Sequence, residues 1–399
     1  GFAIATAAIT AKAIGAGDQE TARKNAGSAL IFMFVSGVIL VSILYPLLPI
    51  ALDLLGAKGE THQLSLEFMQ IAIVSFPLMS IGMASSALLR AQGDAKRAMY
   101  VTLSAGAAAM VIDPLLIFGF DMGIYGAAWA IFFVRIVLLC VGLHGVLIVH
   151  KMVEWPDVRT ASKTLKPFMI IGIPAVLTQI ATPIGNAYVT AAIADFGDDA
   201  VAGWAIVGRL MPLAFAAVFA LSGAVGPILS QNLGAGKFDR VNLAMRDSLI
   251  FVLAYSVLVW VILAISWQWI AYAFSAENDA KLLIRFFCLF VAGSFIFNGA
   301  LFVSNAAFNN LGFPVYSTVF NWGRATLGVI PFVWIGKAWG PEGILAGWGA
   351  GGIIFGVLSV IVCFRAIKTL PEIEGKKPDS VTYIPTANSP FTSGRGASS

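Results

Sequence analysis

The chain has 399 residues, of which 59% are hydrophobic and 12% are charged. Soluble globular proteins have about 45–50% apolar and about 25% charged residues, so this composition excludes a soluble enzyme. The three cysteines, Cys140, Cys288 and Cys363, lie far apart inside apolar segments, which excludes a disulfide framework and a cysteine-based metal site. The net charge of +4 becomes informative only when the positive residues are assigned to the two sides of a membrane.

Long apolar runs separated by short polar stretches occupy most of the chain. Many of them approach or exceed the roughly 20 residues that an α-helix needs to cross a bilayer. A membrane-spanning barrel would instead show alternating segments of about 10 residues. The sequence therefore predicts an all-α polytopic membrane protein. The eleven expected segments are 1–13, 27–52, 64–89, 98–120, 122–149, 167–194, 201–230, 246–273, 283–308, 313–336 and 341–367.

Four parts are expected along the chain: an N-terminal bundle at 1–150, a polar cytoplasmic linker at 151–166, a second bundle at 167–368 and a cytoplasmic tail at 369–399. The tail is rich in Pro, Ser, Thr and Gly and is expected to be disordered. The first apolar run ends before Lys12 and is too short to span a membrane, and no methionine precedes it. These features predict that the sequence is a fragment of a longer protein.

Lysine and arginine residues gather on one side of the expected membrane. With residues 12–25 placed in the cytoplasm, 18 of the 25 positive residues lie on that side, and four lie on the other. The positive-inside rule then predicts an integral protein of the plasma (inner) membrane whose C-terminus is cytoplasmic. The other three positive residues, Arg135, Arg209 and Arg324, fall within expected spans.

An internal repeat is visible in the glycines. Glycines of the first half recur in the same order and at nearly constant offsets in the second half, which chance does not easily supply. Six helices per copy would give two parallel-repeat bundles related by an axis along the membrane normal, as in secondary transporters. Counting back from Pro167, the first copy would start about 52 positions before Gly1, so about one and a half helices of the first bundle would be missing from twelve. An offset of 219 pairs Gly15 with Gly234, Gly17 with Gly236 and Gly93 with Gly312, and an offset of 217 pairs Gly119 with Gly336, Gly123 with Gly340 and Gly126 with Gly343.

Two Gly-Ala-Gly loops, at 15–17 and 234–236, follow apolar helices. Glycine often ends a helix in the left-handed conformation, so helix capping is one explanation of both loops. A phosphate-binding loop is excluded, because Gln231 stands where that motif needs glycine and Phe238 where it needs Ser or Thr.

Taken with their context, these loops resemble the repeated signature of the multidrug and toxic compound extrusion (MATE) family. The matching residues are Gln231 and Asn232 before the second loop, Arg209 with Pro212 in the preceding apolar run, Asp113-Pro114 and Arg324 in Asn-Trp-Gly-Arg. The resemblance extends from residue 1 to about 368 and is strongest with the DinF-like branch. It implies two MATE-type bundles and the export of organic, often cationic, xenobiotics in exchange for ions.

Asp113 is the only carboxylate deep inside an expected span. An ionisable residue at that depth is costly, so it indicates a proton or cation site. A structural alternative is that Asp113 pairs with Arg135 or Arg324. Pro114 follows directly and removes a helix hydrogen bond, which predicts a bend next to the carboxylate.

The resemblance implies that Asp113 corresponds to the fifth-helix aspartate that holds the coupling ion in DinF-like members. Ala109 stands where that branch has a sodium-binding asparagine, and Ala130-Ile131 stand near its threonine. Sodium prefers several oxygen ligands, by analogy with other hard cations. We therefore expect protons rather than sodium as the coupling ion. The acids that the NorM-like branch uses in its second bundle have no counterpart in the expected spans after Pro167.

Other polar residues within expected spans have two explanations. Gln179, Asn186, Asn298 and Asn305 are candidates for lining a transport cleft, and interhelical hydrogen bonding explains them equally well. Arg135, Arg209 and Arg324 are interpreted as structural cations bonded to carbonyls or reaching the membrane surface. Trp204 and four other tryptophans at the ends of apolar runs are interpreted as interface anchors.

The sequence thus predicts a secondary antiporter with no catalytic residues, no metal site and no cofactor. A flippase for lipid-linked precursors or polysaccharides, from the same superfamily, is the alternative. The expected partners are the lipid bilayer and small organic substrates, with no nucleic acid, and the expected state is a monomer.

Overall fold

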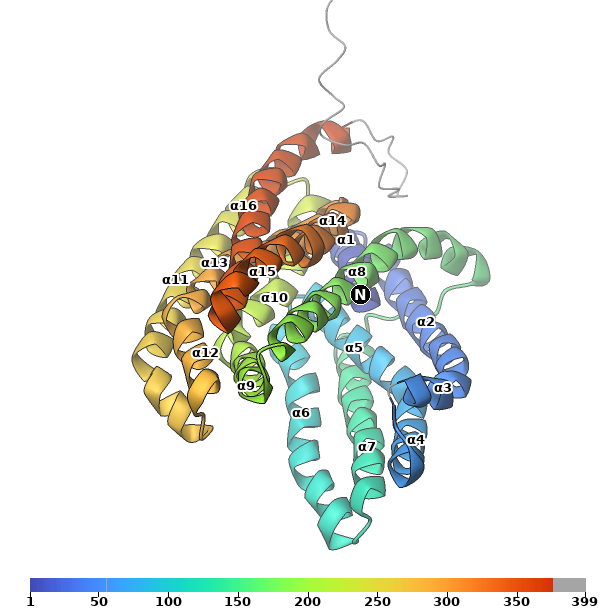
Figure 1. Cartoon of the computed structure of the whole chain (residues 1–399). Helices are drawn as coiled ribbons and strands as arrows, with labels where there is room; N and C mark the ends of the chain where they lie inside the picture. Colours follow the sequence, from blue (N-terminus) through green and yellow to red (C-terminus); the bar gives the residue numbers. More distant parts are fainter. Residues whose placement is uncertain (55, 376–399) are drawn as a thin grey trace, which may run out of the picture. The chain divides into compact units, whose positions relative to one another are not determined.

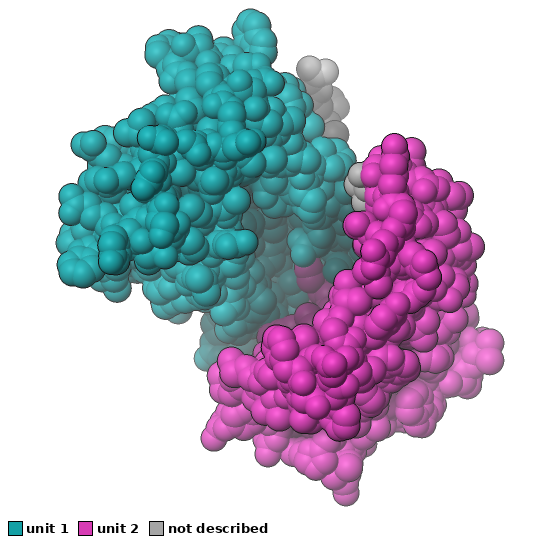
Figure 2. Space-filling view, turned by 60° about the horizontal axis from the view of Figure 1, so that its bottom comes forward, with its two compact units in different colours: residues 1, 170–399 teal, residues 2–169 magenta. Residues whose placement is uncertain are grey.

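The computed structural model describes residues 1–54 and 56–375, and within these ranges every regular element is helical (Figure 1). The described chain divides into two compact units, unit 1 with residues 1 and 170–375 and unit 2 with residues 2–169 (Figure 2). Among the described residues, eight helical segments are long and apolar enough to cross a membrane, and a ninth is added if one bent helix pair is a single span. The expectation of an all-α polytopic membrane protein is confirmed.

Unit 2 is built from seven α-helices, short 3₁₀ and π segments, and the first part of α8. Its α6 packs on α5 and α7, and α2 packs on α1 and α5. The elements are α1 (Phe2–Gly15), α2 (Gln19–Leu44), the 3₁₀ turn η1 (Tyr45–Leu47), α3 (Leu48–Leu54), α4 (Gly59–Val74), α5 (Phe76–Ala91), α6 (Ala95–Pro114), the π segment η2 (Leu115–Gly119), α7 (Gly123–Leu143), the π segment η3 (His144–Val149) and α8 (Val158–Ala194).

Unit 1 contains the rest of α8 and eight further α-helices. Its largest helix contacts are those of α16 with α13 and α15. The elements are α9 (Asp198–Ala214), α10 (Ala216–Gly234), α11 (Phe238–Ala273), α12 (Asn278–Leu289), the 3₁₀ turn η4 (Val291–Ser294), α13 (Phe295–Leu311), α14 (Pro314–Gly323), the π segment η5 (Arg324–Gly328), α15 (Ile330–Gly336), the 3₁₀ turn η6 (Lys337–Trp339) and α16 (Gly340–Gly375).

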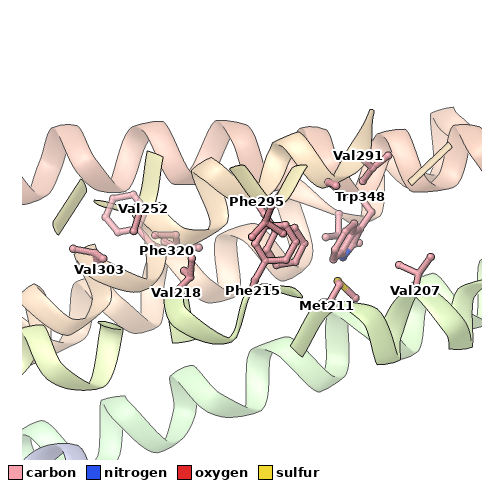
Figure 3. Packing of buried hydrophobic residues seen from close by; sticks show 14 of the residues in the cluster. Val207, Met211, Phe215, Val218, Val252, Val291, Phe295, Val303, Phe320 and Trp348 are labelled. Carbon is pink, nitrogen blue, oxygen red and sulfur yellow. The ribbon is translucent and has the colours of Figure 1, made fainter. Parts of the chain in front are cut away.

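Buried hydrophobic residues, with stacked aromatic rings among them, form the core of unit 1 (Figure 3). The rings of Phe215 and Phe295 stack with centroids 4.1 Å apart, and Trp204 meets Trp348 edge-on at 5.6 Å. Such pairs add about 0.5–1.5 kcal/mol beyond the burial of their area. Trp204 is buried, so its interpretation as an interface anchor was wrong.

Close helix packing in unit 1 depends on three glycines of α16. A methyl group on Gly343, Gly347 or Gly351 would lie 1.9–2.3 Å from a backbone carbonyl oxygen of α15 or η5. Small residues at such spacing let membrane helices approach closely, because lipid provides no hydrophobic force between them. Gly126 of α7 makes the same kind of approach to the backbone of η2.

The helix starts repeat with the offsets found in the glycines. Four helices of unit 2 have partners in unit 1 at an offset of 219, and one has its partner at 217. The first four pairs of starting residues are Gln19 and Phe238, Gly59 and Asn278, Phe76 and Phe295, and Ala95 and Pro314, and the fifth pair is Gly123 and Gly340.

Five expected apolar runs are each broken into two α-helices, namely 27–52, 64–89, 201–230, 283–308 and 313–336. Run 64–89 divides at Ser75 into α4 and α5, which are bent by 43° relative to each other. Run 201–230 divides at Phe215, where the backbone leaves the helical region and the ring enters the core of unit 1. Average hydropathy is unaffected by such breaks, which explains why the sequence did not predict them.

Two expected boundaries also differ from the structure. The linker expected at 151–166 is only partly irregular, since α8 begins at Val158. The tail expected to be disordered from 369 is helical up to Gly375, because Leu370 is buried in the core of unit 1 together with Ala366 and Ile367. The expectation for 376–399 lies outside the described residues.

Candidate transport site

Asp113 lies near the end of α6, directly before a π-helical turn. Pro114 has no N–H to continue the α-helical ladder, and the chain changes to η2, where Phe120 N donates to the carbonyl of Leu115 five residues earlier. Helical segments of the π type occur frequently at functional sites. The bend that the sequence predicts at this proline therefore takes the form of a widened turn.

The Asp113 side chain is half-buried and, among the described residues, has no hydrogen bond or ion pair. Ala109 lies one turn earlier on α6, and Ala130 is buried on α7. Neither alanine offers a side-chain oxygen, so α6 and α7 supply few ligands for a metal cation at this carboxylate.

Arg135 of α7 caps the break between α4 and α5. Its Nη1 donates to the carbonyl oxygen of Ala72 at 2.7 Å and to Ser75 Oγ at 2.8 Å. The last carbonyls of a helix have no partner within it, and a guanidinium from a neighbouring helix satisfies one here. This geometry agrees with the interpretation of Arg135 as a carbonyl-bonded structural cation, and its partners do not include Asp113.

The corresponding break in unit 1 is capped differently. There Trp260 Nε1 donates to the carbonyl of Leu289 at 3.0 Å, and Asn298 Nδ2 lies 3.4 Å from the carbonyl of Ser294. The position that matches Arg135 at an offset of 217 is Gly352, whose missing side chain leaves room for Asn298. The two units therefore satisfy the same backbone feature with different side chains.

Arg324 is the first residue of the π segment η5, and only 6% of it is exposed. Its Nη2 donates to Thr182 Oγ1 of α8 at 3.1 Å, while its Nε is buried without a partner. Thr182 carried no local sequence signal, because 142 residues separate it from Arg324. Arg209 of α9, by contrast, is exposed.

The four expected cleft-lining residues fall into two groups. Gln179 is exposed and Asn186 is half-buried, both on α8. Asn298 and Asn305 are buried on α13, with exposed fractions of 3% and 8%, and the Oδ1 atom of each lacks a partner. Their burial within unit 1 favours packing and hydrogen bonding over contact with a substrate, and the cleft-lining role of all four stays a prediction.

The signature glycines act as helix caps. Gly15 and Gly234 end α1 and α10, and the left-handed residues are the second glycines, Gly17 with φ 79° and Gly236 with φ 68°. Gly236 N donates to the carbonyl of Leu233, and a similar bond joins Gly17 to the preceding helix. Capping thus explains why both loops carry glycine.

Gln231 and Asn232 precede the second cap and are half-buried on α10. Asn232 Nδ2 donates to the carbonyl of Ile228, and the Asn232 carbonyl accepts from Lys237 N beyond the cap. The signature residues therefore stabilise the end of α10.

A polar cluster at the α5–α6 loop of unit 2 was not expected from the sequence. Asp94 caps α6 by accepting from Arg97 N at 2.9 Å, and its second oxygen contacts Arg97 Nη1 at 2.6 Å and His150 Nε2 at 2.8 Å. These partners, Arg97 first, hold the pKa of Asp94 well below its usual range. A cavity of about 100 Å³ lies beside the cluster, lined in part by Arg23 and Gln92.

Comparison with known proteins decides the family. The family model MatE matches residues 1–115 and 174–335, which is more than half of the chain. The chain belongs to the MatE family. Members of this family are transporters and not enzymes, and the long apolar helices of the described residues agree with an integral membrane protein of this family. The comparisons do not favour the flippase alternative, and membership of the DinF-like branch stays a prediction.

Individual relatives agree with this assignment. The chain is 28% identical over 330 residues to the "FAD transporter" of Shewanella oneidensis, covering 81% of this chain and 73% of that protein. It is 24% identical over 245 residues to the "Multidrug export protein MepA" of Staphylococcus aureus, covering 59% and 53%. A crystal structure of a mutant of the Vibrio cholerae MATE transporter VcmN superposes with a TM-score of 0.88 at 24% identity, covering 93% of this chain and 85% of that one.

Proposed function

We propose that this MATE protein is a secondary antiporter of the plasma (inner) membrane that exports organic compounds, cationic xenobiotics among them, while protons move inward. The observation that supports this most strongly is Asp113, a carboxylate in an apolar helix next to a π turn, with no partner among the described residues. In an apolar span such a carboxylate is far less costly when it binds a proton or a cation. Release of that proton would make the site negative again and ready for the next ion.

Protons are favoured over sodium because of the residues around Asp113. Ala109 and Ala130 supply no oxygen, and hard cations need several oxygen ligands. Gly126 of α7 packs so closely on the backbone of η2 that a methyl group at this position would have no room. The π segment after Asp113 is therefore held firmly against α7. A proton needs only the carboxylate itself.

The test is efflux of a fluorescent cationic dye from proteoliposomes holding the full chain. A pH gradient and a sodium gradient are imposed separately, and Asp113→Asn is compared with Asp121→Asn. The control removes a carboxylate from the same region, and Asn tolerates the left-handed backbone of Asp121 at φ 53°. We expect pH-driven efflux that Asp113→Asn stops and Asp121→Asn preserves. Efflux driven by sodium at equal pH would overturn the proton assignment, and full activity of Asp113→Asn would remove Asp113 from the mechanism.

A flavin nucleotide is a second candidate substrate. The relative from Shewanella oneidensis that aligns over 81% of this chain is named an FAD transporter. FAD should therefore be included in the efflux assay beside the cationic dye.

The expected orientation has its own test. The distribution of Lys and Arg supports a cytoplasmic C-terminus. A C-terminal reporter that is active only in the cytoplasm should be active when fused to the chain. An active periplasmic reporter at the same place would refute the orientation.

A further inference from the structure

Arg324 lies in the middle of an apolar stretch of unit 1. The segment from Pro314 to Gly336 has no other charged residue, and Arg324 stands ten residues after its start and twelve before its end. Its exposed fraction is 6%. A charged side chain at the centre of a span is costly and marks a substrate or ion pathway by default.

Nothing in the described part of unit 1 neutralises this charge. Among the described residues, the side chain of Arg324 makes one hydrogen bond, to the neutral hydroxyl of Thr182, and no ion pair to a carboxylate, and its Nε has no partner. Arg135 differs, because one helix-end carbonyl and one hydroxyl account for its position. Its hydrogen bonds to the helix end explain the position of Arg135. The contacts of Arg324 leave its buried charge and its Nε donor without a function.

The backbone around Arg324 adds a second, independent observation. The residue begins the π segment η5, and α16 packs so tightly on η5 that a methyl group on Gly351 would lie 1.9 Å from the carbonyl oxygen of Gly328. In unit 2 the π segment η2 follows Asp113 within the corresponding helix. Each unit thus has one ionisable residue at a π segment, Asp113 two residues before η2 and Arg324 as the first residue of η5, although the two positions are not equivalent in the repeat.

We propose that Arg324 and Thr182 form a recognition site in unit 1 for the phosphate group of an organic anion that the protein transports. A guanidinium presents donors in a planar fork that matches phosphate oxygens, and the Thr182 hydroxyl keeps its own proton to donate. A neutral ligand would leave the charge uncompensated, and a cation would be repelled by it. This inference rests on the proposed function and adds phosphate-bearing compounds to the substrates of the same transporter.

The test measures binding without any ion gradient, so it is independent of coupling. Purified full chain in detergent is titrated with two ligand pairs that differ only by one phosphate group, riboflavin with FMN and adenosine with AMP. We expect the phosphate-bearing member of at least one pair to bind at least tenfold more tightly. Arg324→Gln should reduce that preference to less than twofold, whereas the control Arg285→Gln should keep it, because the Arg285 charge is placed over the ring of Trp267 at 5.4 Å.

A second variant protects the test against misfolding. Thr182→Val keeps the shape of the side chain and should weaken binding of the phosphate-bearing ligand three- to tenfold, with an unchanged unfolding temperature. Equal binding of both members of each pair by the wild-type chain, or a preference that survives Arg324→Gln, would overturn the proposal. If Arg324→Gln changes only the binding of phosphatidylglycerol, the site serves a lipid headgroup and the assignment to a substrate is wrong.

The two proposals fail in distinguishable ways. Loss of pH-driven efflux with an intact phosphate preference would refute proton coupling alone. Intact efflux of a cationic dye without any phosphate preference would refute the Arg324 site alone.

Discussion

Replacement of Arg135 by methionine tests whether this intramembrane cation holds the α4–α5 break together. Arg135→Met keeps an unbranched apolar stem but removes both donated hydrogen bonds, at 2.7 Å to the Ala72 carbonyl and 2.8 Å to Ser75 Oγ. Hydrogen bonds to charged groups contribute about 1.5–3 kcal/mol each. The Ala72 carbonyl also accepts a hydrogen bond from Ser75 Oγ at 2.7 Å, so it still has a partner after the substitution. We therefore expect the free energy of unfolding to fall by about 2 kcal/mol in total.

The assay is thermal unfolding of the purified chain in detergent. A loss of 1 kcal/mol lowers the Tm of a unit of this size by about 2–4 °C, so Arg135→Met should unfold about 4–8 °C below the wild type. The control Arg209→Met alters an exposed arginine and should change the Tm by less than about 2 °C. A double-mutant cycle with Ser75→Ala should give a coupling of about 1 kcal/mol. Equal Tm values for the two arginine variants, or loss of efflux without loss of stability, would refute the structural role of Arg135.

Three further predictions concern packing, capping and pH. Gly351→Ala places a methyl group against the Gly328 carbonyl and should destabilise unit 1 by about 1–3 kcal/mol, seen as a lower Tm. Gly236→Ala forces a left-handed alanine and should cost about 1 kcal/mol, whereas Gly236→Asn should cost less; equal losses would contradict the cap. The pKa of Asp94 in the folded protein is depressed, so its contribution to stability is complete above about pH 4 and declines as the pH falls below that value. Asp94→Asn should therefore lower the Tm at about pH 7 more than at about pH 3.5. An equal effect at both pH values would contradict the Arg97 and His150 contacts.

The sequence alone determined the membrane class, most helices and the repeat. Hydropathy reports the transfer free energy of each segment into lipid, which is a local property, so apolar runs of sufficient length indicated spans. The ordered glycines indicated the repeat for a local reason as well, since a left-handed backbone at Gly17, Gly93, Gly236 and Gly312 favours the residue without a side chain. The same offsets then recur in the helix starts.

The tertiary structure decided which polar groups meet. The partners of Arg135 lie 60 and 63 residues away, and Thr182 lies 142 residues from Arg324, so no local pattern could pair them. The breaks at Ser75 and Phe215 also depend on distant groups, because a helix can end inside an apolar run only where other helices satisfy or cover its open carbonyls. The sequence singled out Arg135 and Arg324 equally, and only their surroundings distinguish a half-buried arginine that caps a helix end from a buried one whose Nε has no partner.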